Sequence, residues 1–338
     1  MKKQLKSIIV TYKSPFELHI ANGGEKAAGN MSTVKKTDNG RVYISGQKQK
    51  YLFFRSLDEI NKTEGSPNDT YVSNGNAVFT DIQKNLRADF GGYMIPKGEA
   101  YLGKRVAPVS ATFCVATAAS KTFNDLLVRL NDMDMKGIMP ANKEVSEYDE
   151  MHGSFHLNVD SLGVKYYDNV DKNMNVGKVY KAFYSEEEKL RRIKMFIKAS
   201  TCLTGYSNSA RNMVSGEPSE VIIAFMPNHS NKISRYYSEH TTDTERDAIL
   251  KQVIQMGGVV FRGCDNEEVT VYDCVELALA EIENWNIWND LPVVTEEEFA
   301  EETREALKNY ETSEDKKNKK ELAEKTKKDK KNKEVVDG

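Results

Sequence analysis

The alternation of apolar and polar positions along the chain first predicts strands. Residues 5–12 (LKSIIVTY) are mostly apolar, and residues 155–164 alternate apolar side chains with histidine, asparagine and aspartate. Such patterns are typical of strands with a buried face. The apolar stretches 106–117, 221–226 and 259–262 predict three more strands. We expect the strands at 106–117 and 155–164 to belong to one sheet.

Helical spacing begins directly after Ser45. Residues 41–44 form a short extended segment, and Ser45 is a good N-cap because its hydroxyl can accept a hydrogen bond from a free N–H of the first turn. Apolar residues at i, i+4 and i+7 form one face, and basic or aromatic residues form the other. These are Phe53, Leu57 and Ile60 on the first face, and Lys48, Tyr51 and Arg55 on the second. One face should pack, and the other should present positive charge beside an aromatic ring.

Three further helices follow later in the chain. Ser185 and Glu188 have the spacing of a capping box that begins a helix, and Gly205 is its natural stop. Residues 244–256 and a segment that starts at Asp273 also show helical spacing. All the predicted helices except the last lie between predicted strands, so the chain is expected to be an α+β protein with βαββαβ connectivity.

The domain organisation follows from the stretches that do not fit this connectivity. Residues 62–105 and 119–153 fit poorly and are interpreted as insertions into a body that covers residues 1–294. Residues 295–338 are acidic at first and then rich in lysine, with few large apolar side chains. Such a segment cannot form a core, so this tail is expected to be largely disordered, with a short helix possible around 299–310.

Composition excludes several classes of protein. The chain has 338 residues, 39% of them hydrophobic, and a net charge of −3, so no strongly basic body is present. The longest uninterrupted apolar run, residues 221–226, is far too short to cross a bilayer, and the N-terminus has no run of signal-peptide length. Four cysteines without a CxxC pair suit reduced thiols. A cytoplasmic protein without a membrane partner is expected.

Familiar catalytic and metal-binding patterns are incomplete. Residues 24–30 have the glycine spacing of a phosphate-binding loop without its lysine, and residues 98–105 end in Arg105 where a magnesium-binding hydroxyl belongs. His152 and His156 lie on a predicted strand, where a spacing of four residues places two imidazoles too far apart to share one ion. No catalytic residue, metal site or cofactor is therefore expected.

The segment 41–51 (RVYISGQKQKY) carries the clearest candidate chemistry. A helix N-terminus with a hydroxyl cap and several lysines can bind phosphate through backbone N–H groups, the helix dipole and direct charge. The competing interpretation is an ordinary amphipathic helix with a solvated basic face. Spacing alone slightly favours that ordinary helix.

The same segment resembles the S-x-Q-x-x-K signature that begins the first helix of the crRNA-binding backbone subunit of type I CRISPR Cascade complexes, in its DevR-like branch. Ser45, Gln47 and Lys50 match that signature, with Arg55 beyond it. Similar stretches extend over about residues 1–290: Ser14-Pro15 with the following Asn/Gly-rich loop, Asp81 with FGGYM (90–94), KRVAP (104–108), FHLNVD (155–160) and TGYSNSARN (204–212). Where the family often has a second basic residue after the motif lysine, this chain has Tyr51.

The resemblance implies a modified RRM-like, ferredoxin-like palm with fingers at about 62–105 and a thumb at about 119–153. It also implies that Ser45, Gln47 and Lys50 hold the RNA backbone. Further candidate RNA contacts are Lys48, Arg55, Arg105, Arg211, Asn22 and Lys26. Residues 133–140 (MDMKGIMP) are the candidate for a thumb loop that pushes between bases.

The function implied by the resemblance is a non-enzymatic RNA-binding scaffold that polymerises along crRNA in a Cascade complex for antiviral defence, with subtype I-B favoured. Its partners would be crRNA, other copies of itself, other Cascade subunits and target DNA through the guide heteroduplex. Backbone contacts position RNA without reading its sequence, so any guide would be accepted.

Two other functions stay open at this point. The first is a backbone subunit like those of type III complexes, which would cleave target RNA with a loop aspartate and a divalent metal. Asp81, Asp89 or Asp132 would have to serve in that role. The second is a free-standing regulatory protein that is indifferent to RNA.

Overall fold

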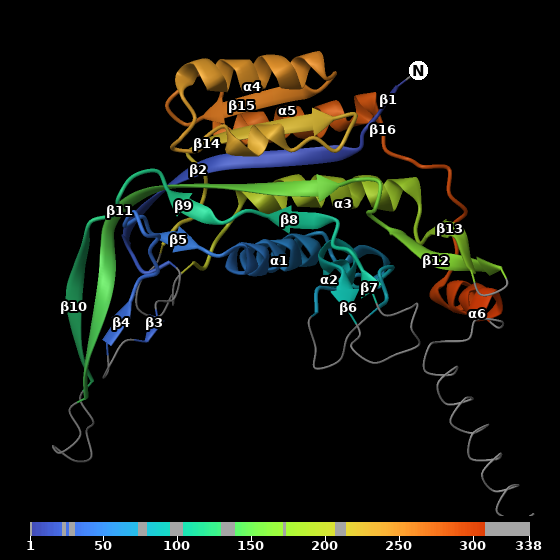
Figure 1. Cartoon of the computed structure of the whole chain (residues 1–338), viewed down its shortest axis with the longest axis horizontal. Coiled ribbons are helices and arrows are strands. Elements are labelled where there is room, and N and C mark those ends of the chain that lie inside the picture. The colour runs from blue at the N-terminus through green and yellow to red at the C-terminus, as the bar shows by residue number, and fades with distance from the viewer. Residues whose placement is uncertain are drawn as a thin grey trace, which may run out of the picture.

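The computed structural model describes residues 2–21, 25–26, 31–73, 80–94, 104–129, 139–171, 174–206 and 214–307. Strand β2 (Ser7–His19) runs through the middle of a central sheet, and helices lie against both faces of that sheet (Figure 1). Among the described helices, none has both the length and the apolarity that a bilayer crossing would require.

The central strands have the order β14, β2, β11 and then β8 with β9. Strands β11 (Met139–Asn158) and β14 (Glu220–Met226) pair antiparallel with the two edges of β2. Strands β8 (Val109–Ala111) and β9 (Cys114–Ala116) pair antiparallel with the far edge of β11. This is the 4-1-3-2 order of a ferredoxin-like βαββαβ sheet, so the predicted α+β fold is confirmed. Strand β15 (Val259–Cys264) extends the sheet beyond β14.

Two hydrophobic cores lie on opposite faces of this sheet. Successive side chains of a strand point to opposite faces, and β2 shows this directly because Ile8 and Val10 enter one core while Ile9 enters the other. In β14 the two sets are Val221, Ile223 and Phe225 against Ile222, Ala224 and Met226. The run 221–226 is therefore buried on both sides, as its uninterrupted apolar sequence predicts.

Helices α1 (Gly46–Thr63) and α3 (Glu186–Thr201) contact each other over the larger core. The Phe53 ring of α1 lies between the rings of Phe155 and Phe196, with centroids 5.6 and 5.7 Å away. Helix α5 (Val271–Glu281) covers the same face near β14 and β15. Helix α4 (Asp243–Gln255) and the 3-10 helix η2 (Lys232–Arg235) cover the opposite face.

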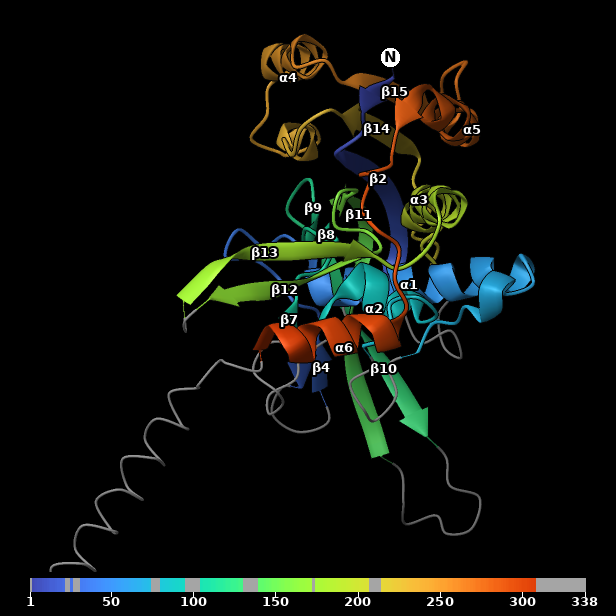
Figure 2. The ribbon, with the colours of Figure 1, turned by 90° about the vertical axis from the view of Figure 1, so that its right-hand side faces the viewer.

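Two hairpins extend from the sheet region in different directions (Figure 2). The first joins β10 (Thr122–Arg129) to the N-terminal half of β11, and the second joins β12 (Val164–Asp171) to β13 (Met174–Ala182). The predicted thumb, residues 119–153, therefore includes the first hairpin together with a part of β11 that pairs with β2. Residues 130–138, which hold most of the predicted wedge 133–140, lie outside the described residues.

Helix α6 (Glu296–Leu307) packs against the second hairpin. Phe299 is buried against Tyr167 and Phe183, and Lys165 donates to the Glu296 carboxylate at 2.5 and 2.6 Å. The helix predicted within the tail thus begins three residues earlier than expected and belongs to the folded body, because Phe299 supplies an apolar anchor. Residues 308–338 lie outside the described residues.

The remaining elements are short. The short strands are β1 (Lys3–Gln4), β3 (Glu25–Lys26), β4 (Met31–Thr33), β5 (Tyr43–Ile44), β6 (Tyr93–Met94), β7 (Lys104–Arg105) and β16 (Trp285–Asn286). The short helices are η1 (Pro67–Asp69), α2 (Leu86–Gly91) and η3 (Ile282–Asn284). Elements β5, α2 and β7 matter most here because they bring the chain to the candidate site.

Three predicted strands differ clearly from the structure. The strand predicted over 5–12 is β2, which begins at Ser7 and continues to His19. The strand predicted over 155–164 ends at Asn158, because the Asn158 carboxamide oxygen accepts from Ser161 N at 3.3 Å and turns the chain. The strand predicted over 106–117 is divided into β8 and β9, and their pairing with β11 shifts by one residue between them. An extra residue of this kind is a β-bulge, which an apolar pattern does not reveal.

Candidate nucleic-acid interface

The N-terminus of α1 is held against the sheet by a close backbone contact. Strand β5 pairs with β9 and leads directly to Ser45, whose hydroxyl oxygen accepts from Lys48 N at 3.3 Å as the N-cap. A Cβ at Gly46 would lie 2.9 Å from the Ala111 carbonyl oxygen, so only glycine allows this approach. The first turn contains no acidic residue, so the positive end of the helix dipole is not neutralised there.

The buried side of the first turn carries a polar anchor. Gln49 is fully buried, and its carboxamide oxygen accepts from the Tyr206 hydroxyl at 2.8 Å. Tyr206 lies at the start of the segment 204–212 that the sequence singles out, so this hydrogen bond joins that segment to α1. Sequence reasoning missed Gln49. Its spacing of four residues from Phe53, which places both on one helix face, is the signal that could have found it.

The exposed side of α1 presents the predicted cations. Lys48 is half-buried and its Nζ lies 4.8 Å from the centroid of the Tyr51 ring. Burial lowers the pKa of Lys48, and the positive charge of Arg55 lowers that pKa further. Arg55 is exposed, and its guanidinium lies against Gly205. Lys48, Tyr51 and Arg55 thus form one row along the helix, as their spacing predicts.

A second arginine joins this row from a different element. Arg87 lies in α2, with its guanidinium carbon 4.8 Å from the centroid of the Phe54 ring of α1. Burial lowers the pKa of Lys50, and the positive charge of Arg87 is the second cause. Arg87 was missed because it lies in the predicted insertion 62–105, where nothing in the local pattern connects it to α1.

We call Lys48, Lys50, Tyr51, Arg55 and Arg87 the α1 basic patch. Of the ion pairs formed within the described part of the chain, none involves any of these four cations. After burial, the positive charge of Arg55 lowers the pKa of Lys48 and that of Arg87 lowers the pKa of Lys50, which is the opposite of what a carboxylate partner would do. The patch can therefore hold anions, and a phosphate would relieve this repulsion.

The other predicted contacts are distributed as follows. Ser45 is partly exposed and Gln47 is exposed at the helix tip, so both lie beside the α1 basic patch. Lys26 lies in β3. Asn22 and Arg211 lie outside the described residues.

The prediction that Arg105 contacts phosphate is wrong. Arg105 is 8% exposed, and its guanidinium nitrogens donate to the Asp89 carboxylate at 2.8 Å and to carbonyl oxygens of four residues. Those acceptors are Ala88, Asp89, Ser161 and Val164. The side chain that was predicted to bind RNA therefore makes its hydrogen bonds inside the protein, where it connects β7 to α2 and to the start of β12.

The aspartates considered for metal-dependent cleavage have separate surroundings. Asp89 is fully buried and both of its carboxylate oxygens accept hydrogen bonds from protein groups. Asp81 is partly exposed, and one carboxylate oxygen accepts from the backbone N–H groups of Gln83 and Lys84. Asp132 lies outside the described residues. Within the described part of the chain, no three side chains of the kind that bind metals gather in one place.

One comparison with known proteins identifies a family. A family model described as the CRISPR-associated negative auto-regulator DevR/Csa2 matches residues 10–232, about two thirds of the chain. A search of curated proteins returned no match.

Two solved structures share the fold. A chain of a "CRISPR RNA-guided surveillance complex" is 12% identical, and one of a "CRISPR RNA-guided surveillance complex, pre-nicking" is 9% identical. Each comparison covers 81% of this chain, with 98% and 99% of the respective neighbour, and each has a TM-score of 0.50. Because the family model covers well over half of the sequence, the chain belongs to the CRISPR-associated DevR/Csa2 family.

Proposed function

We propose that this protein is a non-catalytic backbone subunit that binds crRNA in a Cascade surveillance complex. The observation that carries the proposal is the α1 basic patch beside a helix N-terminus, whose four cations from two elements have no carboxylate partner among the residues that the structure describes. Lysine and arginine side chains with a free helix tip are the groups that bind phosphates of a nucleic-acid backbone. The CRISPR-associated family and the two structural neighbours, which are chains of CRISPR RNA-guided surveillance complexes, support a role in such a complex.

The charge distribution suits a subunit that assembles with copies of itself. A net charge of −3 leaves most of the surface without strong attraction for RNA, so binding is confined to the patch. Contacts to the RNA backbone would position the guide without reading its bases, which then stay available for pairing with target DNA. Other copies of the chain and other Cascade subunits would occupy the remaining faces.

The position of Asp89 removes one of the three aspartates considered for a nuclease. A metal-dependent nuclease needs a carboxylate oxygen that is free to coordinate the ion, and Asp89 has none because two arginines, one tyrosine and a backbone N–H occupy them. No observation on the described residues favours cleavage of target RNA. The scaffold is the proposed function because the α1 basic patch supports it.

Replacing Ser45, Gln47, Lys48 and Lys50 together by alanine should flatten the salt dependence of RNA binding. For single-stranded RNA, each neutralised phosphate contributes about 0.7 to the slope of log K against log salt, so loss of two lysines should reduce that slope by about 1.4. Binding of a fluorescent oligoribonucleotide across a salt series measures it. A slope equal to that of the wild type would show that the α1 basic patch is not the RNA site.

A matched control removes two exposed lysines from other helices. Lys198 lies on α3 and Lys251 on α4, and both are exposed. The double alanine variant of these residues should keep the wild-type slope.

A wild-type protein that binds no RNA at any salt concentration would instead support a free-standing regulator. Circular dichroism of each variant checks that loss of the Ser45 cap has not unfolded α1.

A further inference from the structure

Tyr51 is the only aromatic residue of the α1 basic patch, and the core does not need it. Its side chain is 52% exposed, in contrast to Phe53 and Phe54 on the neighbouring positions of the same helix, which are buried. An aromatic ring left half in water among four cations gains little stability from burial. A ligand that covers the ring would supply the missing contact.

Cations of the α1 basic patch lie close to Tyr51 along the helix surface. Lys48 Nζ lies 4.8 Å from the ring centroid, on the preceding turn. Arg87 of α2 contacts the same helix three residues further along, where its guanidinium carbon lies 4.8 Å from the centroid of the Phe54 ring. Tyr51 therefore lies on the part of α1 that also carries Lys48 and that Arg87 contacts from α2. A nucleotide bound there would meet charge at its phosphates and an aromatic ring at its base.

We propose that Tyr51 is a stacking platform for one nucleobase of the bound RNA strand, while Lys48, Lys50, Arg55 and Arg87 hold the adjoining phosphates. This inference rests on the proposed function and adds a contact to a base. Single-strand binding sites combine a basic track with aromatic rings in this way, and every base has a face that can stack. Such a site would accept any base at that position. The stacking contact would also add affinity for RNA that does not depend on the salt concentration.

The competing explanation is that Tyr51 acts only by holding Lys48 in place through the cation–π contact. The two roles predict different salt behaviour. Loss of a stacked base removes a contact without charge, so affinity falls by the same factor at every salt concentration. Displacement of Lys48 removes an ionic contact, so the slope of affinity against salt falls as well. Base-free RNA separates the roles further, because it keeps the phosphates and lacks the stacking partner.

The test compares wild type, Tyr51→Ala and Tyr51→Phe on two strands. One is a short oligouridylate, and the other is the same strand with stable abasic ribose analogues in place of the nucleotides. Tyr51→Ala should bind the oligouridylate about 5- to 100-fold more weakly with an unchanged salt slope, and Tyr51→Phe should bind it like wild type. On the abasic strand all three proteins should bind equally. Tyr272→Ala on α5, where Tyr272 is 72% exposed, is the control and should match wild type on both strands.

Three results would overturn the inference. Equal binding of the oligouridylate by wild type and Tyr51→Ala would show that the ring touches no base. Equal losses on both strands, or a lower salt slope for Tyr51→Ala, would assign the ring to positioning Lys48. Failure of the proposed function looks different, because then the quadruple variant at Ser45, Gln47, Lys48 and Lys50 also keeps the wild-type slope.

Discussion

Replacing Asp89 by asparagine should lower the free energy of unfolding by about 3–5 kcal/mol, because two buried arginines would lose their shared anion. Asp89 accepts from Arg192 Nη1 at 2.7 Å and from Arg105 Nη2 at 2.8 Å. The Tyr184 hydroxyl and Gly163 N also donate to it, at 2.6 and 2.9 Å. An asparagine cannot neutralise either guanidinium, and its NH₂ group would face donors that need an acceptor.

The carboxylate form is the form that this network requires. Burial opposes ionisation of Asp89, yet the charges of Arg192 and Arg105 prevail and lower its pKa below the ordinary aspartate value. The stability that Asp89 contributes is thus present above the ordinary aspartate pKa of about 4 and is lost as the pH falls through the folded-state value. That acid-dependent loss should be absent from Asp89→Asn.

Urea unfolding of wild type and Asp89→Asn at neutral pH measures the predicted loss. Asp81→Asn is the matched control, because one Asp81 oxygen accepts from two backbone N–H groups and a carboxamide oxygen can do the same. We expect Asp81→Asn to change the free energy of unfolding by less than about 1 kcal/mol. A similarly small effect of Asp89→Asn would contradict the role of Asp89 as the centre of the network.

The network also connects stability to the α1 basic patch. Asp89 and Arg87 lie on the same six-residue helix, α2, which is too short to hold its own shape in water. The ion pairs of Asp89 with Arg192 of α3 and Arg105 of β7 fix α2, and α2 in turn holds Arg87 over Phe54. Folded Asp89→Asn protein should therefore also bind RNA more weakly than wild type.

The sequence was sufficient to predict α1 because the information for that helix is local. The Ser45 cap acts on the next turn, and the apolar stripe through Phe53 and Leu57 needs only the helical repeat. The strands β2 and β14 were predicted for the same reason, since alternation or an apolar run reports directly on burial. The exposed positions of Lys48 and Arg55 follow from this geometry.

The arginines of the predicted insertion show where local information ends. Nothing in the local sequence distinguishes Arg105 from Arg87, but Arg105 forms an ion pair with Asp89 while Arg87 belongs to the α1 basic patch. The different roles of the two arginines depend on contacts with α3 and β12. Arg105 and Val164 of β12 are 59 residues apart in the chain, and Asp89 and Arg192 of α3 are 103 residues apart. A motif resemblance marked the basic dipeptide 104–105 and could not indicate which guanidinium meets a buried carboxylate.

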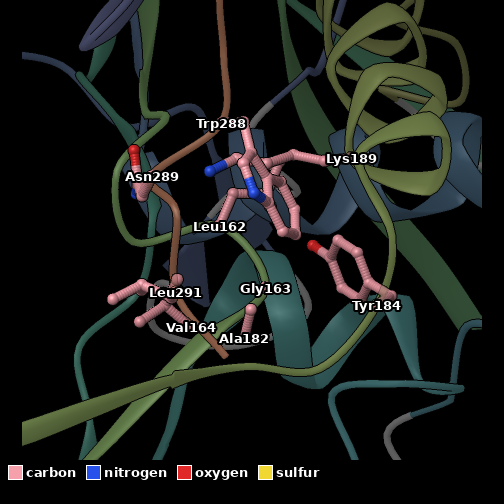
Figure 3. Close-up of a pocket in the computed structure, with 9 residues that line it drawn as sticks. All are labelled: Leu162, Gly163, Val164, Ala182, Tyr184, Lys189, Trp288, Asn289 and Leu291. Atoms are coloured by element: carbon pink, nitrogen blue, oxygen red, sulfur yellow. The ribbon is translucent and has the colours of Figure 1, made fainter. Parts of the chain in front are cut away.

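A buried lysine on α3 provides the second large effect. Lys189 is 2% exposed and extends into a small cavity beside the Trp288 indole, with Tyr184 and Leu162 also lining it (Figure 3). Burial lowers the pKa of Lys189 to about 8, and the negative charges of Asp160, Asp89 and Glu186 oppose that shift without cancelling it. The ammonium group thus destabilises the folded state at neutral pH.

Lys189→Met should raise the free energy of unfolding by up to about 3 kcal/mol at pH 7, because it removes the cost of burying a charge and keeps a long unbranched side chain. The unfolded lysine has a pKa near 10.5 and the folded one about 8, so the unfolded chain binds the extra proton between these values. Wild-type stability due to Lys189 therefore rises with pH from about 8 to 10.5, and the advantage of the variant should shrink over that window.

Denaturant unfolding of both proteins from pH 7 to 10, with Lys198→Met on the exposed side of α3 as control, measures the difference. The prediction would be contradicted if the variant were no more stable than wild type at pH 7, or if its extra stability did not change with pH. Either result would mean that the Lys189 ammonium does not destabilise the folded state.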